Sequence, residues 1–209
     1  MPVNDHEQLI SIEAPEGRVE GILAQAPDAM TGVIMVGGAG GGVHGPAGVY
    51  PDLARDFERD GITALRLEYR HPNDLEASVL DTLVGVSALR QHGVQRLVLI
   101  GWSFGGAVVI RAGAQSDAVV GVATVASQTY GTQAVSRLAP RSLLLCHGTA
   151  DTTLPDRCSR DLYARAGEPK DLKLFANDNH GITNHRAELV ETLETWTRNV
   201  LATAEPARW

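Results

Sequence analysis

The sequence predicts one α/β domain built on a mostly parallel, doubly wound sheet with helices on both faces. Short runs rich in Val, Ile and Leu alternate along the chain with longer stretches that have helical spacing. The short runs are mostly continuous in apolar residues, which is typical of strands buried on both faces. The length of 209 residues suits a single core, and no linker, charge block or repeat divides the chain. We therefore expect one domain over residues 1–209.

The chain opens with a predicted antiparallel hairpin, in which residues 11–14 and 18–26 flank a Pro-Glu-Gly turn. Six further strands are expected, at residues 32–38, 62–69, 96–102, 119–126, 142–147 and 172–176. Five helices are expected between and after them, at residues 51–60, 75–92, 104–115, 155–166 and 184–202. Repetition of strand, helix and strand in this way favours parallel pairing through helical crossovers.

Composition excludes several classes of protein. The chain is 44% hydrophobic and 21% charged, as in ordinary globular proteins, so disordered, collagen-like and disulfide-scaffold classes are excluded. Its 25 acidic residues outnumber 18 basic ones, giving a net charge of −7. Because no basic stripe is present, nucleic acid is not expected as a partner. No apolar run approaches the ~20 residues that a bilayer requires, so we expect no membrane span.

The cysteines and the N-terminus indicate a cytoplasmic protein. Residues 1–6 lack the basic and apolar regions of a secretory signal. Cys146 and Cys158 are the only cysteines, and they lack the spacing of metal ligands. A domain of this size does not require a disulfide, so both are expected to be reduced.

Residues 101–105 read Gly-Trp-Ser-Phe-Gly, a G-x-S-x-G pentapeptide between a predicted strand and a predicted helix. This motif requires a sharp turn that lifts the Ser103 hydroxyl above the sheet in a strained backbone conformation. Side chains at positions 101 and 105 would collide across the turn, which explains the two glycines. The alternative interpretation is a glycine-rich helix start with Ser103 as its N-cap.

A serine hydroxyl is a weak nucleophile without an adjacent base, so a histidine and an orienting acid should follow it. Asp151 ends the sequence His-Gly-Thr-Ala-Asp after one predicted strand, and His180 lies in Asn-His-Gly after the last. Sites in open α/β sheets collect at the carboxyl ends of the strands, where all three residues would lie. The order Ser, Asp, His is also the one that this motif predicts.

These assignments have alternatives. Asp151 would otherwise cap a helix or turn, and His180 would be a polar loop residue. Asp178 is the rival acid, but it lies beside His180 in sequence and could not easily hold the far nitrogen of that ring. His147 lies on a predicted strand, and His185 falls in the first turn of the last helix, so both are weaker candidates.

A glycine-rich stretch at residues 37–45 lies between a predicted strand and a predicted helix. It matches G-x-G-x-x-G at Gly40, Gly42 and Gly45, with Glu68 at the end of the next strand, which is a dinucleotide-binding pattern. Against this interpretation, the glycines start late after the strand, and Ser103 is left unexplained. A P-loop is excluded because no Lys-Ser/Thr follows.

Together these motifs resemble the α/β-hydrolase superfamily, specifically its small, capless members similar to dienelactone hydrolase. The resemblance extends from the hairpin to the last helix and rests on G-W-S-F-G-G, H-G-T-A-D and N-H-G in that order. It implies a hydrolase with a Ser103, Asp151 and His180 triad, a small-molecule acyl substrate, and no cofactor or metal. One departure is that dienelactone hydrolases have Cys at the nucleophile, where this chain has Ser103.

The resemblance also implies an oxyanion hole of two backbone N–H groups. Phe104, which follows the serine, would supply one. The glycine-rich stretch stands in place of the family's H-G-x loop, and this alignment assigns the second donor to Ala39, with Gly38 as the alternative. Trp102, beside the nucleophile, would wall an acyl pocket or else be an aromatic residue of the core.

The same residues would also serve a thioesterase, an amidase or peptidase, or an acyltransferase, and a non-catalytic binding module of this fold is a further alternative. Lid domains of this fold are typically inserted after the predicted strand 119–126. Only about fifteen residues, 127–141, follow it here, too few for a multi-helix cap. Without a lid, little apolar wall is available for a long acyl chain, so short acyl groups are expected.

Overall fold

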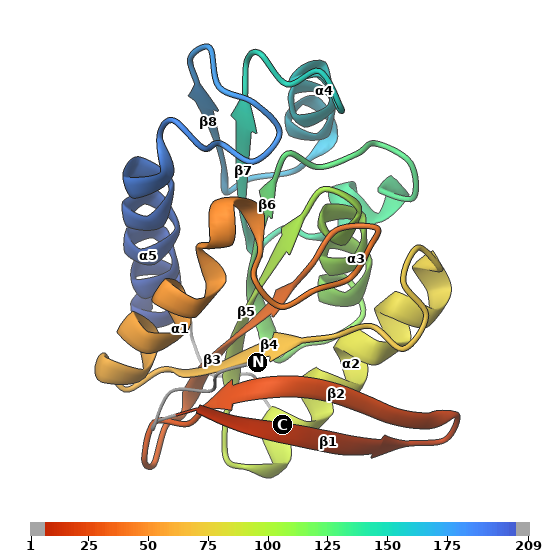
Figure 1. The fold of residues 1–209 in the computed structure, drawn as a ribbon, viewed down its shortest axis with the longest axis vertical. Helices are drawn as coiled ribbons and strands as arrows, with labels where there is room; N and C mark the ends of the chain where they lie inside the picture. Colours follow the sequence, from red (N-terminus) through yellow and green to blue (C-terminus); the bar gives the residue numbers. More distant parts are fainter. Residues whose placement is uncertain (1–6, 204–209) are drawn as a thin grey trace.

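The computed structural model describes residues 7–203 and confirms the predicted architecture (Figure 1). One eight-stranded sheet has the strand order β1-β2-β4-β3-β5-β6-β7-β8. Residues 1–6, for which a signal segment was not expected, lie outside the described part. None of the described helices is long and apolar enough to cross a membrane. The expected cytoplasmic location stays a prediction.

The elements agree closely with the predicted ranges. The strands are β1 (Glu7–Ala14), β2 (Gly17–Ala24), β3 (Thr31–Val36), β4 (Thr63–Leu67), β5 (Arg96–Trp102), β6 (Val119–Val125), β7 (Ser142–Gly148) and β8 (Lys170–Phe175). The helices are α1 (Tyr50–Arg59), α2 (Leu75–Gln91), α3 (Phe104–Gly113), α4 (Arg157–Arg165) and α5 (Arg186–Thr203), with 3₁₀ turns η1 (Pro46–Gly48) and η2 (Gln133–Arg137). The first strand starts earlier than expected because β1 is a half-exposed edge strand whose polar residues form no apolar run.

The sheet is antiparallel only at its N-terminal edge. β1 pairs with β2 and β2 with β4 in antiparallel fashion, and every later pairing is parallel. Helices α1 and α5 cover one face, and α2, α3 and α4 cover the other (Figure 1). In β3, Val33 and Met35 pack on the first face while Ile34 and Val36 pack on the second. Burial on both faces is the reason that this strand is continuously apolar.

Helix α5 begins next to a buried carboxylate, that of Asp178. Its Oδ2 atom accepts hydrogen bonds from the backbone N of His185 at 2.9 Å and from His185 Nδ1 at 2.8 Å. Its Oδ1 atom accepts from the backbone N atoms of Asn179 and Asn184. Burial by itself would raise the pKa of Asp178, but these hydrogen bonds outweigh it and lower the pKa below its ordinary value. The loop of residues 178–185 is therefore anchored at both ends by one ionised carboxylate.

Leu53 and Leu80 form a matched pair for testing how much the core contributes to stability. Leu53 on α1 is fully buried, whereas Leu80 on α2 is 51% exposed. We expect Leu53→Ala to lower the free energy of unfolding by about 2–5 kcal/mol, because it removes buried methyl groups and leaves a cavity. Leu80→Ala should cost much less. Urea unfolding followed by circular dichroism measures both, and equal losses would contradict the packing described.

Asp178→Asn should lower stability in a pH-dependent way. A carboxyl whose native pKa is depressed stabilises the fold above its unfolded pKa of about 3.9, and loses that contribution as the pH falls through the native value. We expect a loss of about 1–3 kcal/mol at pH 7, the cost of weakening hydrogen bonds to a charged group, and a smaller difference near pH 3. Urea unfolding at several pH values measures it. Asp171→Asn, at an exposed position of β8, is the control, and a loss that does not vary with pH would refute the role of ionised Asp178.

Candidate active site

Ser103 occupies a strained turn between β5 and α3. Its φ of 57° and ψ of −115° lie in a region that residues with side chains rarely adopt. Its backbone N donates to the carbonyl of Val125 on β6 at 2.8 Å, and its carbonyl accepts from Gly106 N at 3.0 Å. The Ser103 hydroxyl forms no capping hydrogen bond on α3. The geometry therefore favours a nucleophile turn over the N-cap alternative.

The glycines on either side of Ser103 are required by close backbone contacts. A Cβ atom at Gly101 would overlap the carbonyl oxygen of Gly105 across the turn. A Cβ atom at Gly105 would overlap the carbonyl oxygen of Gly37, in the glycine-rich loop. The G-x-S-x-G spacing thus reflects both the sharpness of the turn and the closeness of that loop.

Asp151 and His180 are in direct contact. Asp151 lies in the loop after β7, His180 lies in the loop before α5, and His180 Nδ1 is 2.7 Å from Asp151 Oδ2. The other carboxylate oxygen accepts from the backbone N atoms of Thr153 at 2.8 Å and Leu154 at 2.9 Å. Asp151 does cap this turn, as the alternative held, but it binds His180 at the same time.

The environment of Asp151 keeps its side chain ionised. Burial by itself would raise the pKa of this carboxyl, but the hydrogen bond from His180 and those from the backbone of Leu154 and Thr153 lower it below its ordinary value. An ionised Asp151 favours the His180 tautomer that carries its proton on Nδ1. The Nε2 atom, which forms no hydrogen bond with another described residue, then has a free lone pair.

Trp102 connects His180 to the Ser103 turn. Its indole Nε1 donates to the backbone carbonyl of His180 at 3.1 Å, and the two rings lie 5.6 Å apart between centroids. Within residues 7–203, the Ser103 side chain itself forms no hydrogen bond with another residue. Hydrogen bonds thus join the acid to the base, and Trp102 holds the base beside the serine. The role of Trp102 as a wall for the acyl group stays a prediction.

The glycine-rich loop packs beside Ser103. Gly38 is buried, and a Cβ atom built on it would lie 3.6 Å from the Cβ of Ser103, whereas Ala39 is exposed. Glu68 holds the loop, because its Oε1 accepts from Gly42 N at 2.8 Å. The carboxylate that a dinucleotide site would need for the ribose is therefore engaged with the protein's own backbone. The choice between Gly38 and Ala39 as the second oxyanion donor stays a prediction.

His147 is a contact of the candidate acid that the sequence did not single out. It is fully buried on β7, and its Nε2 lies 2.9 Å from the carbonyl oxygen of Leu154 and 3.2 Å from Asp151 Oδ2. A carbonyl only accepts, so Nε2 carries the proton and points it toward both oxygens. Its Nδ1 lies 2.6 Å from Ser159 Oγ on α4. The only sequence signal was its position four residues before Asp151.

Other candidate groups are engaged elsewhere or are chemically quiet. The rival acid Asp178 binds His185 and not His180. Burial raises the pKa of the Cys146 thiol to about 12, so this cysteine stays protonated and unreactive at neutral pH. No group of three His, Cys, Asp or Glu side chains that could hold a metal ion occurs in the part of the chain that the structure describes.

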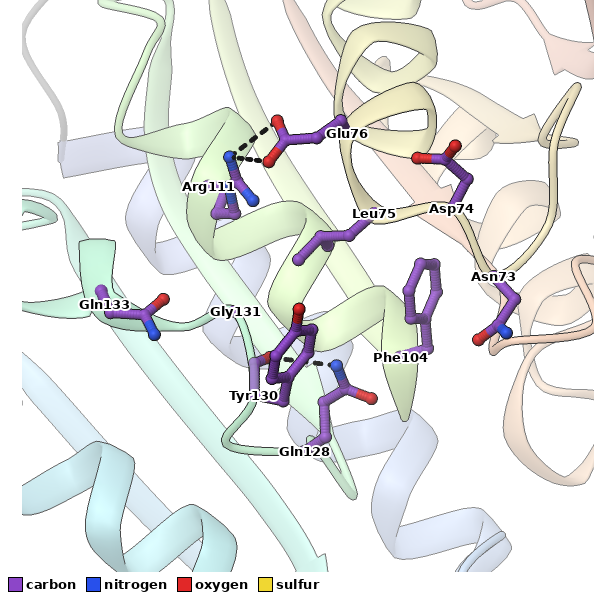
Figure 2. A pocket seen from close by; sticks show the side chains of 10 residues that line it. All are labelled: Asn73, Asp74, Leu75, Glu76, Phe104, Arg111, Gln128, Tyr130, Gly131 and Gln133. Atoms are coloured by element: carbon purple, nitrogen blue, oxygen red, sulfur yellow. Dashed lines mark hydrogen bonds and ion pairs between the residues drawn. The ribbon is translucent and has the colours of Figure 1, made fainter.

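A cavity of about 690 Å³ adjoins the Ser103 turn (Figure 2). Phe104, the residue after Ser103, lines it together with Arg111 on α3. The remaining walls come from residues 73–76 at the start of α2 and from the loop after β6. The backbone N of Gln128 in that loop lies 3.5 Å from the Ser103 carbonyl oxygen. The cavity is therefore within reach of a group bound at the serine.

Comparisons with known proteins agree with this geometry. No family model matches the chain. The uncharacterized protein YfhR of Escherichia coli is 32% identical over a region that covers 48% of this chain and only 44% of that protein, so the chain matches less than half of the relative's length.

Solved structures match almost the whole chain at low identity. A dienelactone hydrolase from Anabaena variabilis is 15% identical with a TM-score of 0.82, covering 93% of this chain and 97% of its own. Est1E from Butyrivibrio proteoclasticus is 14% identical with a TM-score of 0.78, covering 93% and 99%. XC6422 from Xanthomonas campestris, described as a serine hydrolase without lid, is 18% identical with a TM-score of 0.76, covering 98% and 99%. The chain therefore has the α/β-hydrolase fold, similar to that of dienelactone hydrolase, and residues 7–203 include no cap domain.

Proposed function

We propose that this protein is a serine hydrolase that cleaves short-chain carboxylic esters or related acyl compounds through an acyl-serine intermediate. The observation that carries the proposal is the 2.7 Å hydrogen bond between His180 Nδ1 and Asp151 Oδ2, on the sheet edge where Ser103 stands in a strained turn. Two further observations support it: the fold is shared with proteins described as hydrolases and an esterase, and Trp102 holds His180 next to the serine.

In the proposed reaction, Ser103 Oγ attacks the carbonyl carbon of the substrate while His180 Nε2 removes the hydroxyl proton. Asp151 keeps the imidazole in the required tautomer and stabilises the imidazolium ion that forms. His180 then gives the proton to the leaving group, whose bond to the carbonyl carbon breaks, and an acyl-serine remains. Water, deprotonated by His180, attacks this ester, and the acid product leaves as Ser103 regains its proton.

Two backbone N–H groups would stabilise the negatively charged oxygen of the tetrahedral intermediates. The N–H of Phe104 is the first of α3, and such groups have no acceptor within their own helix. The second donor is the N–H of Ala39, or that of Gly38 beside it. In comparable sites each donor contributes about 3–4 kcal/mol to transition-state stabilisation.

The same chemistry would serve a thioesterase, an amidase or peptidase, or an acyltransferase, because these differ in the leaving group or in the final acceptor. A non-catalytic binding module is the alternative from another class. Labelling with a fluorophosphonate probe, which reacts only with an activated serine, separates the enzymes from the binding module.

Three substitutions test the triad. Ser103→Ala should abolish both fluorophosphonate labelling and turnover of p-nitrophenyl acetate, because Asp151 and His180 act only through the serine. Asp151→Asn should lower kcat by a factor on the order of 10⁴, since the wrong imidazole tautomer results. Asp178→Asn is the matched control and should retain labelling at a pH where it is folded. An inactive Asp178→Asn with a nearly unaffected Asp151→Asn would show that the acid is assigned incorrectly.

Acyl-chain length tests the consequence of the missing cap. The connection between β6 and β7 contains only loop and the short η2 turn, so it offers little apolar surface to a long chain. We expect kcat/KM to be highest for p-nitrophenyl esters of about C2 to C6, without activation by lipid droplets. A preference for emulsified C16 or C18 triglycerides over acetate and butyrate esters would refute this expectation.

A further inference from the structure

We propose that the cavity beside Phe104 binds a neutral, hydroxyl-rich group of the substrate, such as the ring of a sugar or a cyclitol. The proposal rests on the proposed function, because it concerns the part of the ester that does not react. The cavity volume of about 690 Å³ lies within the range of roughly 300–1,000 Å³ that is usual for ligand pockets. A single ring attached to the reacting ester would fit this volume.

The side chains around the cavity are rich in amides. Asn73, Gln128 and Gln133 come from two separate segments and are shown together in Figure 2. Gln128 donates its amide N–H to the carbonyl of Tyr130 at 3.0 Å, which leaves its carbonyl oxygen facing no printed donor. Within residues 7–203, the amides of Asn73 and Gln133 form no side-chain hydrogen bond. An amide both donates and accepts, as a hydroxyl does, so these groups match a ligand that carries several hydroxyls.

The charges around the cavity disfavour an anionic ligand. Arg111 is its only cationic side chain, and it is paired with Glu76 at 2.7 Å (Figure 2). Asp74 adds a second carboxylate and accepts from Ala77 N at 3.0 Å, so it already satisfies the N-terminus of α2. Two carboxylates against one guanidinium leave a net charge of −1 in a protein of net charge −7. A carboxylate or phosphate would be repelled here, and a neutral group would not.

Tyr130 supplies an aromatic surface at the same cavity. Its side chain is 78% exposed, and it is the one fully exposed aromatic residue within residues 7–203. A sugar ring presents C–H groups on its faces and hydroxyls around its edge. An aromatic face next to amides complements both parts, because tyrosine combines an apolar ring with a polar tip. An alkyl chain would instead desolvate the amides and carboxylates without replacing their hydrogen bonds with water.

Two matched pairs of esters test the proposal by activity. 6-O-acetylglucose and cyclohexylmethyl acetate differ in the hydroxyls of the alcohol half, whereas methyl quinate and methyl cyclohexanecarboxylate differ in those of the acyl half. We expect kcat/KM to be about tenfold or more higher for the hydroxylated member of at least one pair, the effect of one or two net hydrogen bonds. Equal rates within both pairs, or a preference for an anionic ester such as monomethyl succinate, would overturn the proposal.

Variants locate the preference in the cavity. Tyr130→Ala and Gln133→Leu change exposed side chains, so the fold should be retained. Each should reduce the ratio of hydroxylated to unhydroxylated kcat/KM by about threefold to tenfold, as expected for one lost contact. Gln91→Leu is the matched control, because Gln91 is also exposed and lies at the far end of α2. An unchanged ratio in both cavity variants would overturn the assignment.

A binding measurement separates this proposal from the proposed hydrolase activity. Methyl quinate or methyl cyclohexanecarboxylate is added to the Ser103→Ala variant, and the amide NMR signals of residues 128–133 are followed. Shifts with methyl quinate alone support the cavity assignment even if the wild-type protein hydrolyses no ester, a result that would reject only the hydrolase. Hydrolysis of p-nitrophenyl acetate without such shifts, and without a preference for 6-O-acetylglucose, retains the hydrolase and rejects the cavity assignment.

Discussion

The left-handed backbone of Ser103 is the constraint on which the rest of the site depends. A conformation of this kind costs about 1–3 kcal/mol and persists only when its surroundings hold it in place. Here the hydrogen bond to Val125 fixes the turn to β6, and α3 starts immediately after it. The glycines at 101 and 105 follow from this turn, because a side chain at either position would overlap the backbone. The serine hydroxyl and the first N–H groups of α3 consequently start from the same point.

A second organising group is the carboxylate of Asp151. Buried charges are stable only when hydrogen bonds replace the lost water, and this one has two backbone donors on Oδ1 and two imidazoles near Oδ2. Through His180 it joins the loop before α5, and through His147 it is linked to Ser159 on α4. The acid is thus held by both neighbouring segments and has little freedom to reorient.

The short connection between β6 and β7 determines what lies next to this rigid centre. Where other proteins of the fold insert a lid, this chain has a loop that contributes Gln128 and Tyr130 to a polar, partly open cavity. The start of α2 contributes the opposite side, with Asp74 and Glu76. Chemistry and recognition are therefore carried by different parts of the molecule, the first by strand ends and the second by surface segments.

The sequence by itself determined the strand and helix order, the hairpin and the turn at Ser103, because these depend on local periodicity and on where glycine is required. It also singled out Asp151 and His180, since their positions after predicted strands assign them to one edge. Only the tertiary structure decided that Asp178 pairs with His185, that His147 contacts Asp151, and that segments around residues 73–76, 104–111 and 128–133 enclose a cavity. Such contacts depend on the order of strands in the sheet and on loop conformation, which bring together residues that no local pattern relates.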